Sequence, residues 1–241
     1  MNIKAIIFDV DGTLADTEDG HRKSFNKAFA ESGLDWDWDV ALYEKLLKVT
    51  GGKERIKYFV DSFLTGFTKP DDYEGFVKKL HAVKTLHYTN MLGAGHIPLR
   101  PGITQFIHDA HAAGITLAIA TTTTPQNVSA LLEVGLGKDW EKYFAANGCG
   151  DIVPHKKPAP DIYIWVLDKL RLAPSECIAL EDSYNGLRSA LAADIKTYVT
   201  TNPYTHKQDF TEAAAVFEDL SNLQDFYRVT GLPLPKQQVS V

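Results

Sequence analysis

The sequence contains few cysteines and no long apolar run, and these absences narrow the class of protein. Cys149 and Cys177 are the only cysteines among 241 residues, and their spacing matches neither a disulfide framework nor a structural zinc site. No stretch approaches the ~20 apolar residues of a membrane-spanning helix. The N-terminus lacks the pattern of a signal peptide, so we expect a cytoplasmic protein. A plastid location stays open if a transit peptide was removed.

Positive charge is also scarce. The chain has 25 Lys and Arg against 31 Asp and Glu, a formal net charge of −6. Such an acidic surface repels nucleic acid and anionic membranes, so we expect neither as a partner. Hydrophobic residues make up 44% of the chain, enough for a substantial core. We expect a monomer whose partner is a small molecule, and any phosphate site must be a local positive pocket.

The apolar pattern divides the chain into a helical stretch and an alternating stretch. A buried strand is predicted at 3–8, and residues 18–91 then show helical spacing without interruption. From residue 101 strands and helices alternate, with strands predicted at 115–120, 143–146, 177–180, 196–200 and 214–217, and helices at 104–113, 125–134, 161–170, 183–193 and 220–227. This pattern predicts a doubly wound α/β sheet with a helical insert after the first strand.

The most informative residues are Asp9 and Asp11, directly after the first strand. Two carboxylates at one turn repel each other unless a cation lies between them. Magnesium prefers such oxygen ligands. Asp9 can then act as a nucleophile that takes up a phosphoryl group, with Asp11 as general acid and then general base. Gly12 would permit the turn. The alternative is a turn or helix-capping cluster without catalytic function.

Polar residues at the other predicted strand ends favour the catalytic interpretation. Thr121 follows the second strand and offers its hydroxyl to a phosphoryl oxygen, and Thr122 and Thr123 extend the donor set. A capping run before the helix at Pro125 is the alternative. Lys157 can neutralise phosphoryl charge and keep Asp9 ionised, although a surface lysine is the commoner case.

Glu181 and Asp182 follow the fourth strand and supply further metal-binding carboxylates, with a helix N-cap as the alternative. Taken in order, Asp-Val-Asp-Gly-Thr-Leu, Thr121, Lys157-Pro158 and Glu181-Asp182-Ser183 resemble the haloacid dehalogenase superfamily across nearly the whole chain. The resemblance implies a Rossmann-like core at 1–16 and 94–241, and a mobile α-helical cap at 17–93. It also implies an aspartyl-phosphate intermediate at Asp9.

The same resemblance assigns roles to the residues at the strand ends. Asp11 would be the acid and base, and Thr121 and Lys157 would stabilise the phosphoryl group. Magnesium would be bound by Asp9, by the backbone carbonyl of Asp11 and by Asp182, with Glu181 as an outer or direct ligand.

The helical insert carries a second candidate anion site. Two glycines followed by cations form a loop at a predicted helix N-terminus, suited to a phosphate remote from the one transferred; the loop comprises Thr50, Gly51, Gly52, Lys53, Glu54 and Arg55. A helix start with exposed charges is the alternative. Lys84 could add positive charge, although an isolated helical lysine is usually solvated.

Five motifs together carry a second resemblance: Thr-Glu-x-x-His at 17–21, Gly-Gly-Lys-Glu-Arg at 51–55, Ala-Val-Lys-Thr at 82–85, Lys-Lys-Pro-x-Pro-Asp-Ile-Tyr at 156–163 and Glu-Asp-Ser-x-Asn-Gly-Leu at 181–187. Through these motifs the chain also resembles CbbY-type proteins, which are xylulose-1,5-bisphosphate phosphatases that leave xylulose 5-phosphate. That resemblance implies contacts to the substrate from cap residues, namely Glu18, His21, Lys53, Arg55 and Lys84. β-Phosphoglucomutase is the nearest alternative, because it shares the core and the equivalents of His21 and Lys84. Phosphoglycolate phosphatase, an inactive phosphate-responsive binding protein and a dehalogenase are further alternatives. The intact acidic residues argue against the last two.

Overall fold

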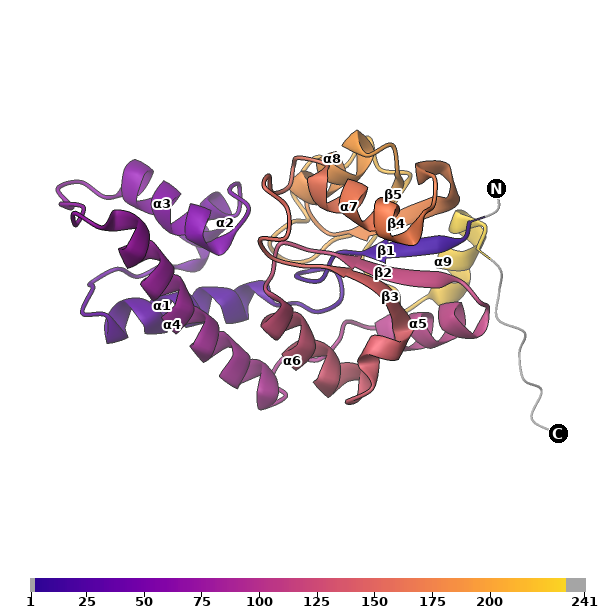
Figure 1. The fold of residues 1–241 in the computed structure, drawn as a ribbon, viewed down its shortest axis with the longest axis horizontal. Helices are drawn as coiled ribbons and strands as arrows, with labels where there is room; N and C mark the ends of the chain where they lie inside the picture. The colour runs from indigo at the N-terminus through magenta and orange to yellow at the C-terminus, as the bar shows by residue number, and fades with distance from the viewer. Residues whose placement is uncertain (1–2, 233–241) are drawn as a thin grey trace.

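One parallel sheet organises residues 3–232, the part of the chain that the computed structural model describes. Its six strands lie in the order β3-β2-β1-β4-β5-β6, and Figure 1 labels the strands from β3 to β5 in this order. The strands are β1 (Ala5–Phe8), β2 (Thr116–Ala120), β3 (Phe144–Gly148), β4 (Cys177–Glu181), β5 (Lys196–Thr200) and β6 (Ala215–Phe217). The central strand β1 pairs with β2 on one side and β4 on the other, so the ends of these three strands are neighbours.

Helices cover both faces of the sheet, which explains the continuous apolar strands. In β1, Ile6 and Phe8 face one core cluster, and Ala5 and Ile7 face the other. The first face is covered by α5 (Ile103–Ala112), α6 (Pro125–Leu136) and α9 (Leu223–Thr230), and the second by α7 (Asp161–Leu170) and α8 (Tyr184–Ala192). The predicted doubly wound α/β core is confirmed.

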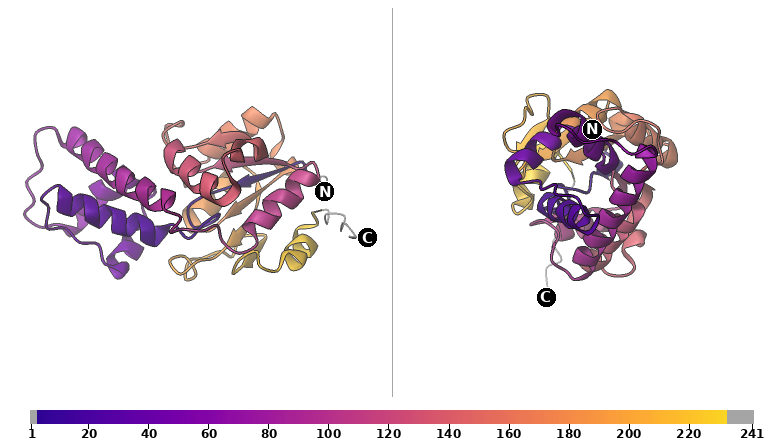
Figure 2. Two further views of the ribbon diagram at one scale, coloured as in Figure 1. Left: turned by 90° about the horizontal axis from the view of Figure 1, so that it is seen from below. Right: turned by 90° about the vertical axis from the view of Figure 1, so that its left-hand side faces the viewer.

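Four helices between β1 and α5 form a separate bundle beside the sheet (Figure 2). They are α1 (Glu18–Glu31), α2 (Val40–Leu46), α3 (Gly52–Phe63) and α4 (Tyr73–Gly93). Aromatic residues fill the centre of the bundle, with Trp38 fully buried against Phe25, Phe29 and Phe59. The bundle therefore has its own core, and the predicted helical insert after the first strand is confirmed.

Two linkers join the bundle to the sheet and lie against each other. Ala15 of the first linker bridges Leu99 of the second. The buried Arg100 guanidinium donates to the carbonyls of Gly12, Thr200, Thr201 and Glu218. Because carbonyls from three backbone segments converge on one side chain, the loop after β1 is held in a defined position.

Most element boundaries differ from the sequence prediction by one to three residues, and three elements illustrate the reasons. Helix α9 begins at Leu223 rather than 220, because the Asn222 side chain accepts the Asp225 N–H and caps the helix there. Helix α6 continues through Gly135 to Leu136, beyond the predicted end at 134, and stops at Gly137, where φ is 89°. Strand β3 runs from Phe144 to Gly148 rather than over 143–146. Within residues 3–232, no helix combines the length and apolarity needed to cross a membrane.

Candidate active site

The carboxyl ends of β1, β2 and β4 bring together the polar residues that the sequence separated. Asp9 follows β1, Thr121 follows β2, and Glu181 and Asp182 stand at the end of β4. All four are buried, with exposed fractions between 1% and 6%. Burial of so many polar groups at one edge of a core requires compensating partners, so the edge is built for a ligand or an ion.

Lys157 provides the positive charge at this edge. Its Nζ lies 2.7 Å from Oδ1 of Asp9 and 2.6 Å from Oε1 of Glu181, and its side chain is only 4% exposed. The hydroxyl of the buried Tyr163 donates to the same Glu181 oxygen at 2.5 Å. Glu181 is therefore the anchor that holds Lys157 against Asp9, and Lys157 is not a surface lysine.

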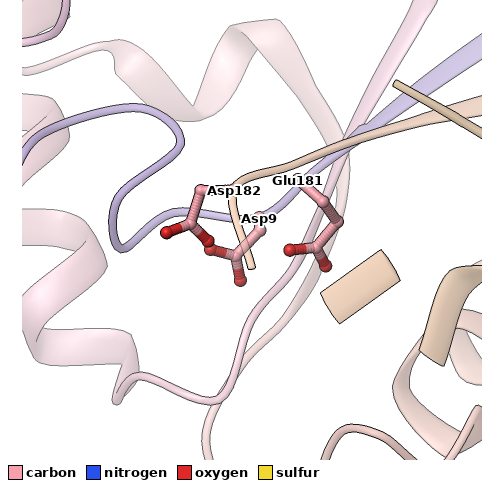
Figure 3. Close-up of side chains that lie close together, drawn as sticks. All are labelled: Asp9, Glu181 and Asp182. Atoms are coloured by element: carbon pink, nitrogen blue, oxygen red, sulfur yellow. The ribbon is translucent and has the colours of Figure 1, made fainter. Parts of the chain in front are cut away.

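The carboxylates of Asp9, Glu181 and Asp182 form one buried cluster (Figure 3), with one oxygen of each within 4.8 Å of the others. Burial raises the pKa of Asp9 to about 8, with Glu181 and Asp11 acting in the same direction and Lys157 opposing them. Burial and the charges of Asp9 and Glu181 also raise the pKa of Asp182 well above its ordinary value. One ammonium cannot balance three carboxylates, and this all-oxygen donor set fits a hard divalent cation.

Local backbone features keep Asp182 available in this cluster. Ser183, not Asp182, is the N-cap of α8, because its Oγ accepts the N–H of Gly186. Asn202 donates from Nδ2 to Oδ2 of Asp182 at 2.7 Å. Gly12 has φ of 84°, and a Cβ there would lie 2.1 Å from Oδ2 of Asp182. Glycine is thus required both by the turn and by the close approach of this carboxylate.

Asp11 points to the helical bundle rather than into the carboxylate cluster. Its Oδ1 lies 2.8 Å from Nε2 of His21, whose Nδ1 lies 2.5 Å from Nζ of Lys84. Burial alone would raise the pKa of Asp11, but the hydrogen bond from His21, the nearby Thr17 hydroxyl and the charge of Lys84 outweigh burial and lower it. Asp11 is therefore ionised here.

His21 and Lys84 are both buried, and His21 stacks on Tyr88 with ring centroids 3.8 Å apart. Burial and the nearby Lys84 lower the pKa of His21, so the ring is neutral. A neutral ring that donates from Nε2 to Asp11 accepts at Nδ1, which gives a chain running from Lys84 through His21 to Asp11. The solvated alternative for Lys84 is wrong, because its side chain lies inside the bundle.

The glycine-rich segment of the bundle faces the sheet edge. Gly51 is the N-cap of α3 with φ of 97°, so the predicted loop at a helix N-terminus is confirmed. Lys53 Nζ lies 2.5 Å from Asp151, and Lys156 contacts the other oxygen of the same carboxylate. Asn185 of α8 donates to Oγ1 of Thr50 at 2.9 Å. These contacts connect the bundle to the core across the entrance of the site.

One cavity of about 180 Å³ joins the two halves of the site. Fifteen of the sixteen candidate residues from the sequence line it: Asp9, Asp11, Glu18, His21, Thr50, Gly51, Gly52, Lys53, Arg55, Lys84, Thr121, Thr122, Thr123, Lys157 and Asp182. Glu181 is the exception, since it lies behind Lys157. The same cavity is thus lined by the acidic residues with Lys157 and by a second cationic pair, Lys53 and Arg55.

The sequence assigned no site role to several residues that line this cavity, among them His81, Asp151, Lys156 and Asn185. His81 fills the space above Gly52, where a Cβ would lie 2.4 Å from its Nε2. Burial, with the charges of Lys84 and Lys53, lowers the pKa of His81 to about 3, so the ring is neutral. His81 lies three residues before Lys84 on α4, and that helical spacing was the available signal.

Comparison with known proteins agrees with this geometry. Residues 3–194 match the model of the haloacid dehalogenase-like hydrolases. The chain belongs to this family of hydrolases, and within it to the CbbY proteins. It is 49% identical to the plasmid-encoded protein CbbY of Cupriavidus necator over 225 residues, which cover 91% of this chain and 87% of that one.

Solved structures give the same grouping. The crystal structure of CbbY from Rhodobacter sphaeroides in complex with phosphate superposes with a TM-score of 0.86 at 42% identity, covering 92% of this chain and 96% of that one. A variant of the Rhodobacter protein was solved in complex with xylulose-(1,5)bisphosphate. A β-phosphoglucomutase from Clostridium difficile shares the fold at 19% identity and a TM-score of 0.75, covering 96% of this chain and all of that one.

Proposed function

We propose that this enzyme is a phosphatase for a sugar bisphosphate, and that its substrate is xylulose 1,5-bisphosphate, which it converts to xylulose 5-phosphate and phosphate. The observation that carries the proposal is the single cavity lined both by Asp9 with Lys157 and by Lys53 with Arg55. A molecule with phosphates at two ends satisfies both groups at once. The bisphosphate bound by the Rhodobacter relative, at 42% identity, supports the same choice.

The residues of the core support a two-step transfer. An Asp9 oxygen attacks phosphorus and the bond to the sugar oxygen breaks. That oxygen takes a proton from Asp11, which must leave His21 and take up a proton before this step. Asp11, now a carboxylate, removes a proton from water, which attacks the aspartyl-phosphate and releases phosphate. Lys157 and Thr121 stabilise the negative charge on the phosphoryl oxygens in both steps. The bond from His21 keeps Asp11 ionised, which suits its role as the base.

The cation that we propose for the acidic cluster is Mg²⁺. It would be held by Asp9, the backbone carbonyl of Asp11 and Asp182, and it would neutralise phosphoryl charge. Glu181 accepts hydrogen bonds from Lys157 and Tyr163 at one oxygen. These bonds favour an outer position for Glu181, in which it fixes Lys157 rather than binding the cation directly.

We propose that the helical bundle, residues 17–93, acts as a cap over a core domain made of residues 1–16 and 94–241. Its two linkers lie side by side at Ala15 and Leu99, so a small rotation there would open the cavity. Glu18, His21, Lys84 and the 50–55 loop then contact the sugar and its second phosphate when the cap closes. The cavity is complete within one chain, which supports a monomer as the active form.

Phosphate release from a panel of sugar bisphosphates and monophosphates tests this proposal. With Mg²⁺ present, we expect the highest kcat/KM for xylulose 1,5-bisphosphate, one phosphate per molecule, and xylulose 5-phosphate as the product. A chelator should abolish the release. Equal kcat/KM for xylulose 1,5-bisphosphate and a sugar monophosphate would contradict the proposal. So would conversion of β-glucose 1-phosphate to glucose 6-phosphate as the faster reaction.

A further inference from the structure

A chain of hydrogen bonds connects three helices of the bundle behind the cavity wall. Arg55 of α3 donates from Nη1 to the hydroxyl of Tyr43 on α2 at 2.7 Å. The Tyr43 hydroxyl donates to Oε2 of Glu18 on α1 at 3.0 Å. Glu18 and Arg55 line the cavity, whereas Tyr43 is fully buried behind them. The hydroxyl of Tyr43 is therefore the link between two groups that face the substrate.

The direction of these bonds is fixed by the chemistry of the three groups. A guanidinium only donates and a carboxylate only accepts, so the single proton of Tyr43 must point to Glu18. Burial raises the pKa of Tyr43 well above its ordinary value, so the hydroxyl keeps this proton. The chain from Arg55 to Glu18 has only one arrangement and cannot be reversed by rotation of the hydroxyl.

Packing around the Tyr43 ring leaves the hydroxyl little freedom. The ring lies against Trp38, with centroids 5.9 Å apart, and against Tyr204 of the core at 6.0 Å. The Arg55 guanidinium lies 5.1 Å from the centre of the same ring. Because the ring is held on these sides, its hydroxyl is a rigid reference point for the flexible side chains of Arg55 and Glu18.

We propose that Tyr43 is a positioning residue for substrate selection, which sets the spacing between the Arg55 guanidinium and the Glu18 carboxylate. The proposal rests on the proposed function, since Arg55 is there the partner of the second phosphate. The fixed spacing favours binding of a sugar that contacts Glu18 through its hydroxyls and Arg55 through a remote anionic group. A phosphate ester without the remote anion uses only one end of the chain.

The test is Tyr43→Phe, which keeps the ring and removes the hydroxyl. Losing a hydrogen bond to a charged group typically lowers binding or kcat/KM by about tenfold to a hundredfold. We expect kcat/KM for xylulose 1,5-bisphosphate to fall by this factor relative to kcat/KM for p-nitrophenyl phosphate. Tyr73→Phe is the matched control, because the Tyr73 hydroxyl has no hydrogen-bond partner among the described residues of the bundle. It should change neither value.

A double variant separates positioning from general support of the fold. If Tyr43 acts through Arg55, adding Tyr43→Phe to Arg55→Ala should lower kcat/KM for the bisphosphate far less than Tyr43→Phe does alone. Additive losses, or equal losses for both substrates, would overturn the proposal. If Tyr43→Phe does not give folded protein, Arg55→Lys tests the same bond from its other partner. We expect a loss selective for the bisphosphate there, and an unchanged substrate ratio would overturn the proposal.

The two proposals fail in distinguishable ways. A wild-type enzyme that gains nothing from the second phosphate of its substrate would refute the proposed function, and the positioning role with it. A wild-type enzyme that strongly prefers the bisphosphate, together with a Tyr43→Phe variant that keeps this preference, would refute the positioning role alone.

Discussion

The ammonium of Lys157 lies 2.7 Å from Oδ1 of Asp9, although 148 residues separate the two in the chain. Both side chains are buried, and Glu181 holds the other side of the same ammonium. A buried charge of this kind is stabilised only by its partners, so removing one partner costs far more than breaking a surface ion pair. The stability of the core and the chemistry of the site therefore depend on the same three residues.

Lys157→Met should destabilise the protein by about 3–5 kcal/mol at pH 8, because it leaves Asp9 and Glu181 without a counter-charge. At pH 5 the loss should be smaller, since a buried carboxyl with a raised pKa takes up a proton as the pH falls. Urea denaturation at both pH values measures this. Lys156→Met is the control; its pair with the largely exposed Asp151 should contribute at most about 1 kcal/mol. Equal losses for both variants would contradict this explanation.

Mg²⁺ should raise the melting temperature of the wild-type protein and should not raise that of Asp182→Asn. A cation that binds only the folded acidic cluster stabilises it by mass action. Without a cation, the variant should melt at or above the wild-type temperature, because the raised pKa of Asp182 means that its ionised form opposes folding at neutral pH. Scans with Mg²⁺ and with chelator measure this. The exposed Asp61→Asn should respond like wild type, and a full Mg²⁺ response in Asp182→Asn would exclude the proposed ligand.

Much of the core could be predicted from sequence because local signals coincide there. Buried strands read as apolar runs, and Asp9, Thr121 and Asp182 stand directly after such runs. Parallel strands end at one edge of the sheet, so residues that directly follow the predicted strands could be expected to lie close together. Helix boundaries such as the start of α9 were less accurate, because a single capping side chain, Asn222, decides them.

The contacts between the bundle and the core could not be predicted. Asp151, Asn185 and Tyr204 are ordinary polar residues in loops or at a helix start, and their roles arise only when distant segments meet. Burial of Lys84 also left no local signal, because a lysine on an amphipathic helix has the same pattern whether it points to solvent or to a neighbouring helix.

Arg55→Ala should raise KM for xylulose 1,5-bisphosphate by about tenfold to a hundredfold, the usual effect of losing a charge-assisted contact. The effect on KM for a small aryl phosphate should be much smaller, because that substrate has no second phosphate. Steady-state kinetics with both substrates measure this. Lys57→Ala is the control on the same helix; its ammonium pairs with the exposed Glu74, outside the cavity. Equal changes in both KM values for Arg55→Ala would argue against a second phosphate site.

Lys84 should make the free energy of unfolding depend on pH above neutrality. Burial lowers the pKa of Lys84 to about 7, from an ordinary value of 10.5. Between these values the unfolded chain binds more protons than the folded one, so the contribution of Lys84 to stability rises with pH from about 7 to 10. Lys84→Met lacks this contribution.

Urea denaturation of both proteins at pH 7 and pH 10 checks this expectation. The stability of Lys84→Met relative to wild type should be greatest at pH 7 and should decline by at least about 1 kcal/mol by pH 10. A difference between the two proteins that is constant across this range would show that Lys84 keeps its proton in the fold.

Mass analysis of the enzyme after rapid acid quench during turnover of xylulose 1,5-bisphosphate tests the central claim most directly. We expect one phosphoryl group on the peptide that contains Asp9, and none when the quench follows complete consumption of the substrate. Asp9→Asn should fold, should carry no phosphoryl group, and should lower kcat by about 10⁴-fold or more. A phosphoryl group on another residue, or appreciable turnover by Asp9→Asn, would contradict the assignment of Asp9 as the nucleophile.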